Sequence, residues 1–150
     1  MVKPGMDRGA QQTVSEPFVL HERLASDTTE VADLTLCRVL LMEDARFPWL
    51  VLVPRINGLR ELHDVPKLQR EQLFDEIELA SLALQHVCDA YKINVGALGN
   101  LVPQLHIHVI ARDPKDPAWP GPVWGMGKAK PYTAQQRTQR LAALSQAIRA

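Results

Sequence analysis

Two apolar runs near the start of the chain predict paired β-strands. Residues 34–42 (LTLCRVLLM) are rich in leucine and lead into the turn-like stretch EDARFP, and residues 49–55 (WLVLVPR) form a second run that Pro54 stops. Apolar runs of this length between turn residues are typical of strands, and their closeness favours an antiparallel hairpin. We expect the preceding segment, residues 18–28, to be a short helix or an irregular lead-in.

The hydrophobic period changes after the Asn57-Gly58 turn. Between residues 64 and 91 the apolar positions recur every three or four residues, at Leu73, Phe74, Ile77, Ala80, Leu84, Val87, Cys88 and Tyr91. This spacing predicts one long amphipathic helix over residues 64–91. Asp64 is expected to cap the free N–H groups at its start, and Pro66 suits its first turn.

Strand composition returns in residues 92–99 (KINVGALG) and again in residues 105–112. The predicted order is therefore strand, strand, long helix, strand, strand. That order argues for an α+β fold in which a helix covers an antiparallel sheet.

The segment after the last predicted strand is rich in proline. Residues 113–131 carry five prolines and several glycines, which exclude helix interiors and central strands. Trp119 and Trp124 are too apolar to remain fully exposed, so we expect an extended segment held by two indoles on its own domain or on a partner chain. Thr133 and Gln136 form a capping box, and a narrow apolar stripe follows at Leu141, Leu144 and Ile148, which together predict a short C-terminal helix.

These patterns divide the chain into three parts. Residues 1–13 lack periodicity and are rich in Gly, Gln and charged residues, which predicts a flexible N-terminal tail. Residues 14–126 are expected to form the folded domain. Residues 127–150 form a basic extension with the short helix, because five basic residues and no acidic residue follow Gly127.

Composition narrows the classes of function. Lys plus Arg and Asp plus Glu both number 17, so no overall field recommends nucleic acid or an anionic membrane as a partner. Cys37 and Cys88 lie in apolar patterns without CxxC spacing and are expected to be buried free thiols. No secretory h-region follows the first residues and no apolar run reaches the length of a bilayer span, so we expect a cytoplasmic protein.

Polar residues interrupt the last apolar run at every second position. Successive side chains of a strand point to opposite faces, so Leu105, Ile107 and Val109 share one face, which must pack on the core. The opposite face carries three polar side chains, from Gln104, His106 and His108.

Three interpretations of this polar face are open. It is a solvated strand face, or it offers two nitrogen ligands to a metal, for which Glu43 and Asp44 could add carboxylates. The third interpretation is nucleophilic catalysis. A neutral imidazole is a good nucleophile toward phosphorus, and a second imidazole can neutralise a phosphate oxygen or a leaving group.

The string 104-QLHIHVI-110 resembles the signature of the histidine triad (HIT) superfamily of nucleotide hydrolases and transferases. The similarity extends from Pro17 to Trp124 through a hairpin ending in LVLVPR, a long helix, the strand KINVG, a glycine-containing loop and the motif strand. It implies a mainly antiparallel sheet of about five strands packed with one long helix. It also implies a homodimer with two sheets joined edge to edge.

The resemblance also implies roles for individual residues. His106 matches the family's nucleophile, which forms a nucleotidyl-phosphoramidate intermediate, and His108 matches the third histidine of the triad. Gln104 stands where the family has its first histidine and keeps a donor and an acceptor, but it cannot carry a proton. Contacts to the nucleotide or its phosphate are implied for Asn100, Asn94, Trp124 and an acidic position at Glu43 or Asp44.

The implied function is hydrolysis or nucleotidyl transfer at the α-phosphate of a nucleoside 5′-phosphate derivative: a phosphoramidate, an aminoacyl-adenylate or a dinucleoside polyphosphate. The covalent route requires no metal or other cofactor. Asn94 and Asn100 also suit ordinary turns. Two alternatives to this function stay open at this point, because Gln104 departs from the triad and because two histidines can also bind a metal. One is a nucleotide-binding or sensor module with weak catalysis, and the other is a metal-binding protein that uses His106 and His108.

Overall fold

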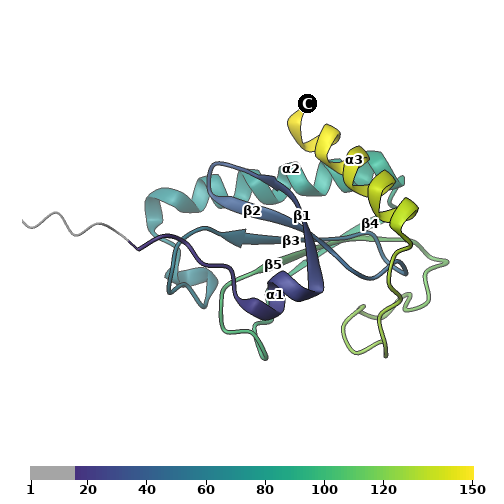
Figure 1. Ribbon diagram of the computed structural model, residues 1–150, viewed down its shortest axis with the longest axis horizontal. Helices are drawn as coiled ribbons and strands as arrows, with labels where there is room; N and C mark the ends of the chain where they lie inside the picture. Colours follow the sequence, from purple (N-terminus) through teal and green to yellow (C-terminus); the bar gives the residue numbers. More distant parts are fainter. Residues whose placement is uncertain (1–15) are drawn as a thin grey trace, which may run out of the picture.

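The computed structural model describes residues 16–150, so the tail predicted over residues 1–13 lies outside the described residues. The chain forms, in order, α1 (Glu22–Asp27), β1 (Thr28–Asp33), β2 (Cys37–Met42), β3 (Trp49–Pro54), two 3₁₀ turns (Leu62–Asp64 and Lys67–Gln69), α2 (Arg70–Cys88), β4 (Lys92–Gly96), β5 (Ile107–Arg112) and α3 (Ala134–Arg149), as Figure 1 shows.

The five strands form one antiparallel sheet in the order β1-β2-β3-β5-β4. The predicted hairpin is confirmed, because β2 and β3 pair from Cys37 opposite Pro54 to Leu41 opposite Leu50. β5 is the last strand in the sequence but lies between β3 and β4, so it is an interior strand. It begins two residues later than predicted, at Ile107, so it contains His108, and His106 directly precedes it. The α+β fold with an antiparallel sheet and a long helix is confirmed.

β1 is the one strand that the hydrophobic pattern does not predict. It is an edge strand with the sequence TTEVAD, and Val31 is its only buried residue. Such a strand carries no clear two-residue period, because polar side chains are tolerated on both of its faces. The segment over residues 18–28, expected to be a short helix or an irregular lead-in, contains the short helix α1 from Glu22 to Asp27, after an irregular stretch.

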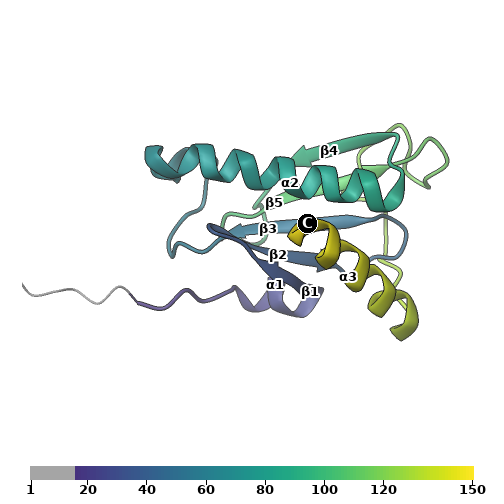
Figure 2. The same ribbon diagram turned by 90° about the horizontal axis from the view of Figure 1, so that it is seen from above.

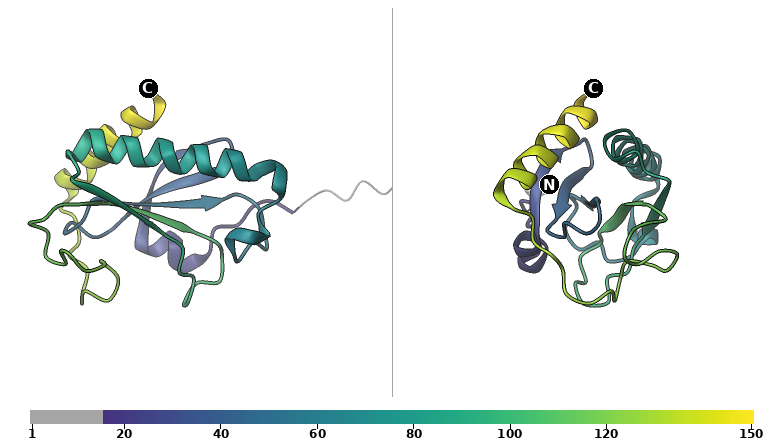
Figure 3. Two further views of the ribbon diagram at one scale, coloured as in Figure 1. Left: turned by 180° about the vertical axis from the view of Figure 1, so that it is seen from behind. Right: turned by 90° about the vertical axis from the view of Figure 1, so that its right-hand side faces the viewer.

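The long helix α2 and the C-terminal helix α3 cover one face of the sheet, and the short helix α1 with irregular segments covers the other. α2 lies over β5 and its neighbours and α3 lies beside it over the β1 side, as Figure 2 shows. The core beneath these helices includes Leu105, Ile107 and Val109, as the alternation predicts. A second apolar cluster on the opposite face includes Trp49 and Ile110. Figure 3 shows the two layers from behind and end-on.

The long helix begins later than predicted. α2 starts at Arg70, after the two 3₁₀ turns, and its N-cap residue Gln69 makes no side-chain capping bond. The expectation that Asp64 caps this helix is wrong: its carboxylate accepts hydrogen bonds from the backbone N–H groups of Arg60 and Glu61 instead. α2 ends at Cys88, before the predicted end at residue 91, and the C-cap residue Asp89 adopts the left-handed conformation with φ of 49°.

The C-terminal helix packs on the same core. The capping box of Thr133 and Gln136 is confirmed at the start of α3, and Leu144 and Ile148 are buried against α2. Both cysteines are free, with Cys37 buried and Cys88 partly buried. Within residues 16–150, no helix combines the length and apolar character needed to cross a membrane.

Candidate active site

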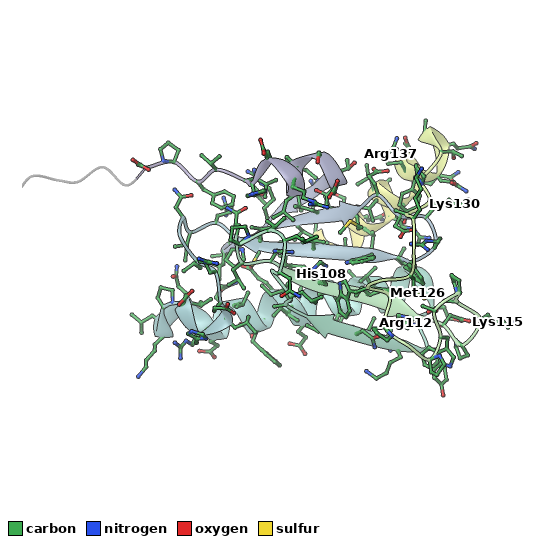
Figure 4. The ribbon with its side chains drawn as sticks, turned by 90° about the horizontal axis from the view of Figure 1, so that it is seen from below. His108, Arg112, Lys115, Met126, Lys130 and Arg137 are labelled. Atoms are coloured by element: carbon green, nitrogen blue, oxygen red, sulfur yellow. The ribbon has the colours of Figure 1, made fainter. Side chains whose placement is uncertain are left out.

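A pocket of about 490 Å³ lies on the sheet face opposite α2 and α3. Its walls come from α1, the turn between β2 and β3, the loop between β4 and β5, β5 itself and residues 123–129 of the proline-rich segment. Figure 4 views this face, with His108 near its centre and Met126 beside it. The volume falls within the range of about 300–1,000 Å³ that is typical of small-molecule sites.

His106 and His108 both line this pocket, and their ring centroids lie 4.9 Å apart. The side chains are largely enclosed, because His106 is 7% exposed and His108 is 5% exposed. The interpretation of this strand face as an ordinary solvated face is therefore wrong. Both imidazoles sit at the base of a cavity.

Hydrogen-bond partners assign the protons of the two rings. His106 Nδ1 lies 2.7 Å from the backbone carbonyl oxygen of Gln104, which can only accept, so in the neutral ring Nδ1 carries the proton and Nε2 keeps a lone pair. The indole Nε1–H of Trp49 donates to His108 Nδ1 at 3.0 Å, so the proton of His108 is on Nε2. Neither Nε2 atom has a protein partner within residues 16–150, and neither is sealed from solvent. The pocket thus receives one lone pair and one N–H donor.

Burial disfavours a charge on the second imidazole. Burial of the ring, with a smaller contribution from neighbouring His106, lowers the pKa of His108 to about 4. His108 is therefore neutral at neutral pH and acts there as a hydrogen-bond donor through Nε2.

Trp124 closes the pocket from the proline-rich segment. Its indole meets His108 edge-on with 5.4 Å between ring centroids, and it meets Trp49 at 6.3 Å. Gly96, which pairs with His108 in the sheet, leaves the space for this indole: a Cβ at Gly96 would lie 2.9 Å from Trp124 Cη2. The segment thus completes the pocket of its own chain, whereas Trp119 stacks over the guanidinium of Arg112.

A buried carboxylate fastens the same segment over the pocket. Asp44 is 2% exposed and accepts two hydrogen bonds from the Arg46 guanidinium, at 2.9 and 2.7 Å, and one from the Arg46 backbone N–H at 3.2 Å. Arg46 also donates to the carbonyl of Met126 at 2.6 Å, and the backbone N–H of Lys130 reaches Asp44 at 3.3 Å. Burial raises the pKa of the Asp44 carboxyl, but these hydrogen bonds outweigh it and hold the pKa below its ordinary value. Asp44 is therefore ionised at neutral pH.

A family model for the HIT domain matches residues 23–115, from α1 to just beyond β5. The chain belongs to the HIT domain family. At the level of the superfamily, HIT proteins are nucleotide hydrolases and transferases.

Solved structures of other HIT proteins agree with this assignment. A histidine triad protein from Marinobacter aquaeolei VT8 is 46% identical, with a TM-score of 0.86 over 89% of this chain and 98% of its own. One from Bradyrhizobium japonicum is 44% identical, with a TM-score of 0.86 over 89% of this chain and 99% of its own. A zinc-bound histidine triad family protein from Mycobacterium smegmatis is 13% identical, with a TM-score of 0.61 over 85% and 89%, and shares the fold alone. No curated protein matches the sequence.

The HIT-like pocket contains some of the residues that the sequence predicts and not others. Asn100, Asp44 and Trp124 line it together with the two histidines. Glu43 does not, because it accepts hydrogen bonds from Arg137 of α3 at 2.6 and 3.0 Å and from Thr29.

Asn94 also lies outside the pocket lining. Its Oδ1 accepts a hydrogen bond from Arg112 at 2.8 Å, so its side chain serves the structure of the β4–β5 pair. Arg112 is almost fully buried and also binds Asp116 and the carbonyl of Gly121, so it anchors the start of the proline-rich segment. In Figure 4 it lies towards the Lys115 end of this face.

The side chain of Gln104 lies outside the pocket and binds the segment before α1. Its Oε1 accepts from the backbone N–H of His21 at 2.8 Å, and its Nε2 donates to the carbonyl of Val19 at 2.9 Å. It is not part of the pocket lining. Gln104 contributes to the site through its backbone carbonyl, which orients His106.

Sequence reasoning missed Trp49 as a site residue and could not separate Arg46 from ordinary surface charges. Trp49 reads as an ordinary apolar residue at the start of a strand. In the sheet, however, Val51 is opposite His108, and Trp49 lies two residues along on the same face, within reach of the imidazole. Arg46 lies two residues after Asp44 in a turn, and no local pattern distinguishes this pair from solvated charges.

A metal bound by His106 and His108 would have no third protein ligand among residues 16–150. Among residues 16–150, no group of three or more His, Cys, Asp or Glu side chains is placed to hold an ion. In addition, Nδ1 of each imidazole is already occupied by a protein partner. A two-histidine arrangement with this geometry offers an ion only the two Nε2 atoms.

Proposed function

We propose that this HIT protein cleaves nucleoside 5′-phosphate derivatives at the α-phosphate, by hydrolysis or nucleotidyl transfer, with His106 as the nucleophile. One observation carries the proposal: the Nε2 lone pair of His106 and the Nε2–H of His108 open into one pocket of nucleotide size. Membership of the HIT family supports the same chemistry. We further propose that Gln104 occupies the position of the first triad histidine.

The reaction runs in two displacements. The lone pair of His106 Nε2 forms a bond to phosphorus while the bond to the leaving group breaks, and that electron pair departs with the leaving group. The ring of His106 then carries a positive charge, which the Gln104 carbonyl stabilises through Nδ1–H. Water or another acceptor attacks phosphorus, the N–P bond breaks, the pair returns to His106, and the acceptor's proton passes to solvent.

Donors around the phosphate support both displacements. The Nε2–H of His108 and the side chain of Asn100 lie in the pocket where negative charge develops on the phosphate oxygens. The apolar wall formed by Leu24, Met42 and Trp124 suits the base and sugar. Asp44, which is held ionised, is the acceptor that we assign to ribose hydroxyls.

The test is release of nucleoside monophosphate from three substrates: adenosine 5′-phosphoramidate, an aminoacyl-adenylate and a diadenosine polyphosphate. We expect turnover of at least one of them that persists in chelator and is lost in His106→Ala. Mass spectrometry of an acid-labile adenylyl adduct on the peptide that contains His106 would identify the intermediate. His63→Ala is the matched control, because that imidazole is 82% exposed and lies outside the pocket.

Other outcomes separate the alternatives. Nucleotide binding without turnover supports a binding or sensor module, and activity that is lost in chelator supports a metal site. Normal turnover in His106→Ala would exclude His106 as the nucleophile.

We also propose that the protein is a homodimer in which β4 pairs with the β4 of a second copy. Within residues 16–150, β4 pairs with β5 alone, so its other edge carries backbone groups without a strand partner there. Two apolar side chains beside this edge are exposed, Tyr91 at 70% and Val95 at 50%. Light scattering should give twice the chain mass of 16.8 kDa, and Val95→Lys should reduce it to one chain. A single-chain mass for the unaltered protein excludes the dimer.

A further inference from the structure

Trp49 lines the pocket but has no part in the proposed mechanism. It is the first residue of β3, is 7% exposed, and meets His108 with 5.5 Å between ring centroids. Its Nε1–H donates to Nδ1 of His108 at 3.0 Å. Trp124 and His106 enclose the same imidazole at 5.4 and 4.9 Å between centroids, so three aromatic rings surround His108.

This hydrogen bond fixes the protonation state of His108 by geometry. An indole nitrogen can donate but cannot accept, so Nδ1 of His108 must present its lone pair. Protonation of Nδ1 would set two N–H groups against each other across 3.0 Å, inside an apolar enclosure. Loss of the Nε2 proton is equally unfavourable, because no proton can reach Nδ1 from the indole and the ring would become an anion. His108 can therefore donate a hydrogen bond but cannot hand over its proton.

Among the pocket residues that the structure describes, no other group replaces His108 as a proton donor. Besides the histidines, the ionisable lining residues are Arg23, Asp27, Asp44 and Arg46. Asp27 pairs with Arg23 at 3.7 Å, and Asp44 pairs with Arg46 at 2.7 Å. Arginine does not release a proton in proteins, and the Asp44 carboxyl is ionised at neutral pH.

The lack of a proton donor matters differently for different leaving groups. The carboxylate of an acyl-adenylate and the phosphate of a polyphosphate leave as stable anions, so no proton is needed when the P–O bond breaks. An amine must be protonated on nitrogen before or while its P–N bond breaks. A positioned general acid contributes about 10²–10⁴-fold to such a step.

We propose that Trp49 is a positioning residue that holds His108 as a neutral hydrogen-bond donor and thereby makes the site selective for substrates whose leaving group departs as an oxyanion. This inference rests on the proposed function. In the step that it describes, His106 Nε2 bonds to phosphorus, the P–O bond breaks, and the electron pair leaves on a carboxylate or phosphate oxygen. The Nε2–H of His108 stays on nitrogen throughout and stabilises that oxygen.

The first experiment compares kcat/KM for acetyl-adenylate and adenosine 5′-phosphoramidate in the wild type, Trp49→Gln and Trp49→Phe. The glutamine oxygen can accept a hydrogen bond from a protonated Nδ1, which allows His108 to act as an acid. We expect the ratio of kcat/KM for acetyl-adenylate to kcat/KM for adenosine 5′-phosphoramidate to fall by about tenfold or more in Trp49→Gln. Trp49→Phe keeps an aromatic ring without a donor or acceptor, so it should lower both rates and leave the ratio within about threefold of the wild type. An equal ratio in all three proteins overturns the proposal.

The second experiment needs no activity. Imidazole ¹⁵N NMR of the wild type should show His108 protonated at Nε2 and bare at Nδ1 at neutral pH, and His108→Asn identifies its signals. A proton on Nδ1, or a charged ring at neutral pH, overturns the role of Trp49. Failure to cleave either substrate overturns the proposed function and with it the selectivity, even if the NMR result shows the expected tautomer. Cleavage of both substrates with a proton on Nδ1 overturns the inference and leaves the proposed function standing.

Discussion

Gln104→Ala tests whether this side chain acts on the substrate or on the fold. In the structure its amide bridges two backbone groups of the segment before α1, at 2.8 Å to His21 and 2.9 Å to Val19. Each hydrogen bond of this kind contributes about 0.5–1.5 kcal/mol, so the substitution should cost about 1–3 kcal/mol. For a chain of this length, the loss corresponds to a decrease in Tm of about 2–12 °C.

The effect on the reaction should follow from the same contacts. The segment leads directly into α1, which contributes Arg23, Leu24 and Asp27 to the pocket wall. Loosening it should raise KM for the nucleotide by about three- to tenfold and leave kcat within about threefold, because binding weakens while the imidazoles keep their partners. Steady-state kinetics measure both constants, and hydrogen exchange at the Val19 and His21 amides reports the loosening directly.

Asn57→Ala is the matched control. Asn57 holds the same segment through Glu16, Pro17 and Val19 and does not line the pocket. If Gln104 only anchors this segment, the two variants should share a lower Tm and a higher KM. A decrease in kcat of about 100-fold or more in Gln104→Ala alone, with Tm unchanged, would refute the reasoning, because only a group acting on the transition state has an effect of that size.

Three further predictions concern the sheet and its two faces. Gly96→Ala would place a methyl group 2.9 Å from Trp124 Cη2, so the indole should shift, which costs about 1–3 kcal/mol of unfolding free energy in urea and changes the Trp fluorescence. An unchanged nucleotide KM would contradict the place of Trp124 in the pocket. The pKa of His108 is about 4 in the folded chain and ordinarily 6.5, so as the pH drops the unfolded chain takes up a proton on this imidazole first. The free energy of unfolding should therefore fall by at most about 3 kcal/mol between pH 6.5 and pH 4. Urea unfolding at several pH values should show a smaller loss for His108→Phe. Glu76→Ala removes the acceptor for two buried backbone N–H groups at the turn between β1 and β2, and it should cost about 2–6 kcal/mol, whereas Glu76→Gln, which keeps one acceptor oxygen, should lose less in the same assay.

The features that sequence predicts here are those with a local signal. The alternation from Leu105 to Val109 identifies the side chains that face the core and the two histidines that face the pocket, although it wrongly extends the pocket face to Gln104. Thr133 with Gln136 identifies the start of α3. Each of these depends on residues within a few positions of one another. Their outcome does not depend on which strands are neighbours.

The features that sequence misses depend on contacts between distant segments. The indole of Trp49 reaches an imidazole 59 residues away, and Arg46 binds a carbonyl 80 residues away. Glu43, an acidic residue beside the expected ribose-binding position, is paired 94 residues along the chain with Arg137. A resemblance to the family motif identifies the chemistry of the two histidines. It does not identify their partners, which come from the proline-rich segment and from neighbouring strands.

The strand order links the formation of the site to the formation of the fold. β5 is the last strand to be synthesised and lies between β3 and β4. Until residues 107–112 leave the ribosome, β4 lacks its partner strand, and β3, which pairs with β2, has one unpaired edge. Until then, the apolar face of α2 also lacks the strand on which it packs. A nascent chain that stops short of β5 therefore has neither a complete sheet nor a histidine pair, and a chain that completes its sheet has placed both imidazoles in the same event.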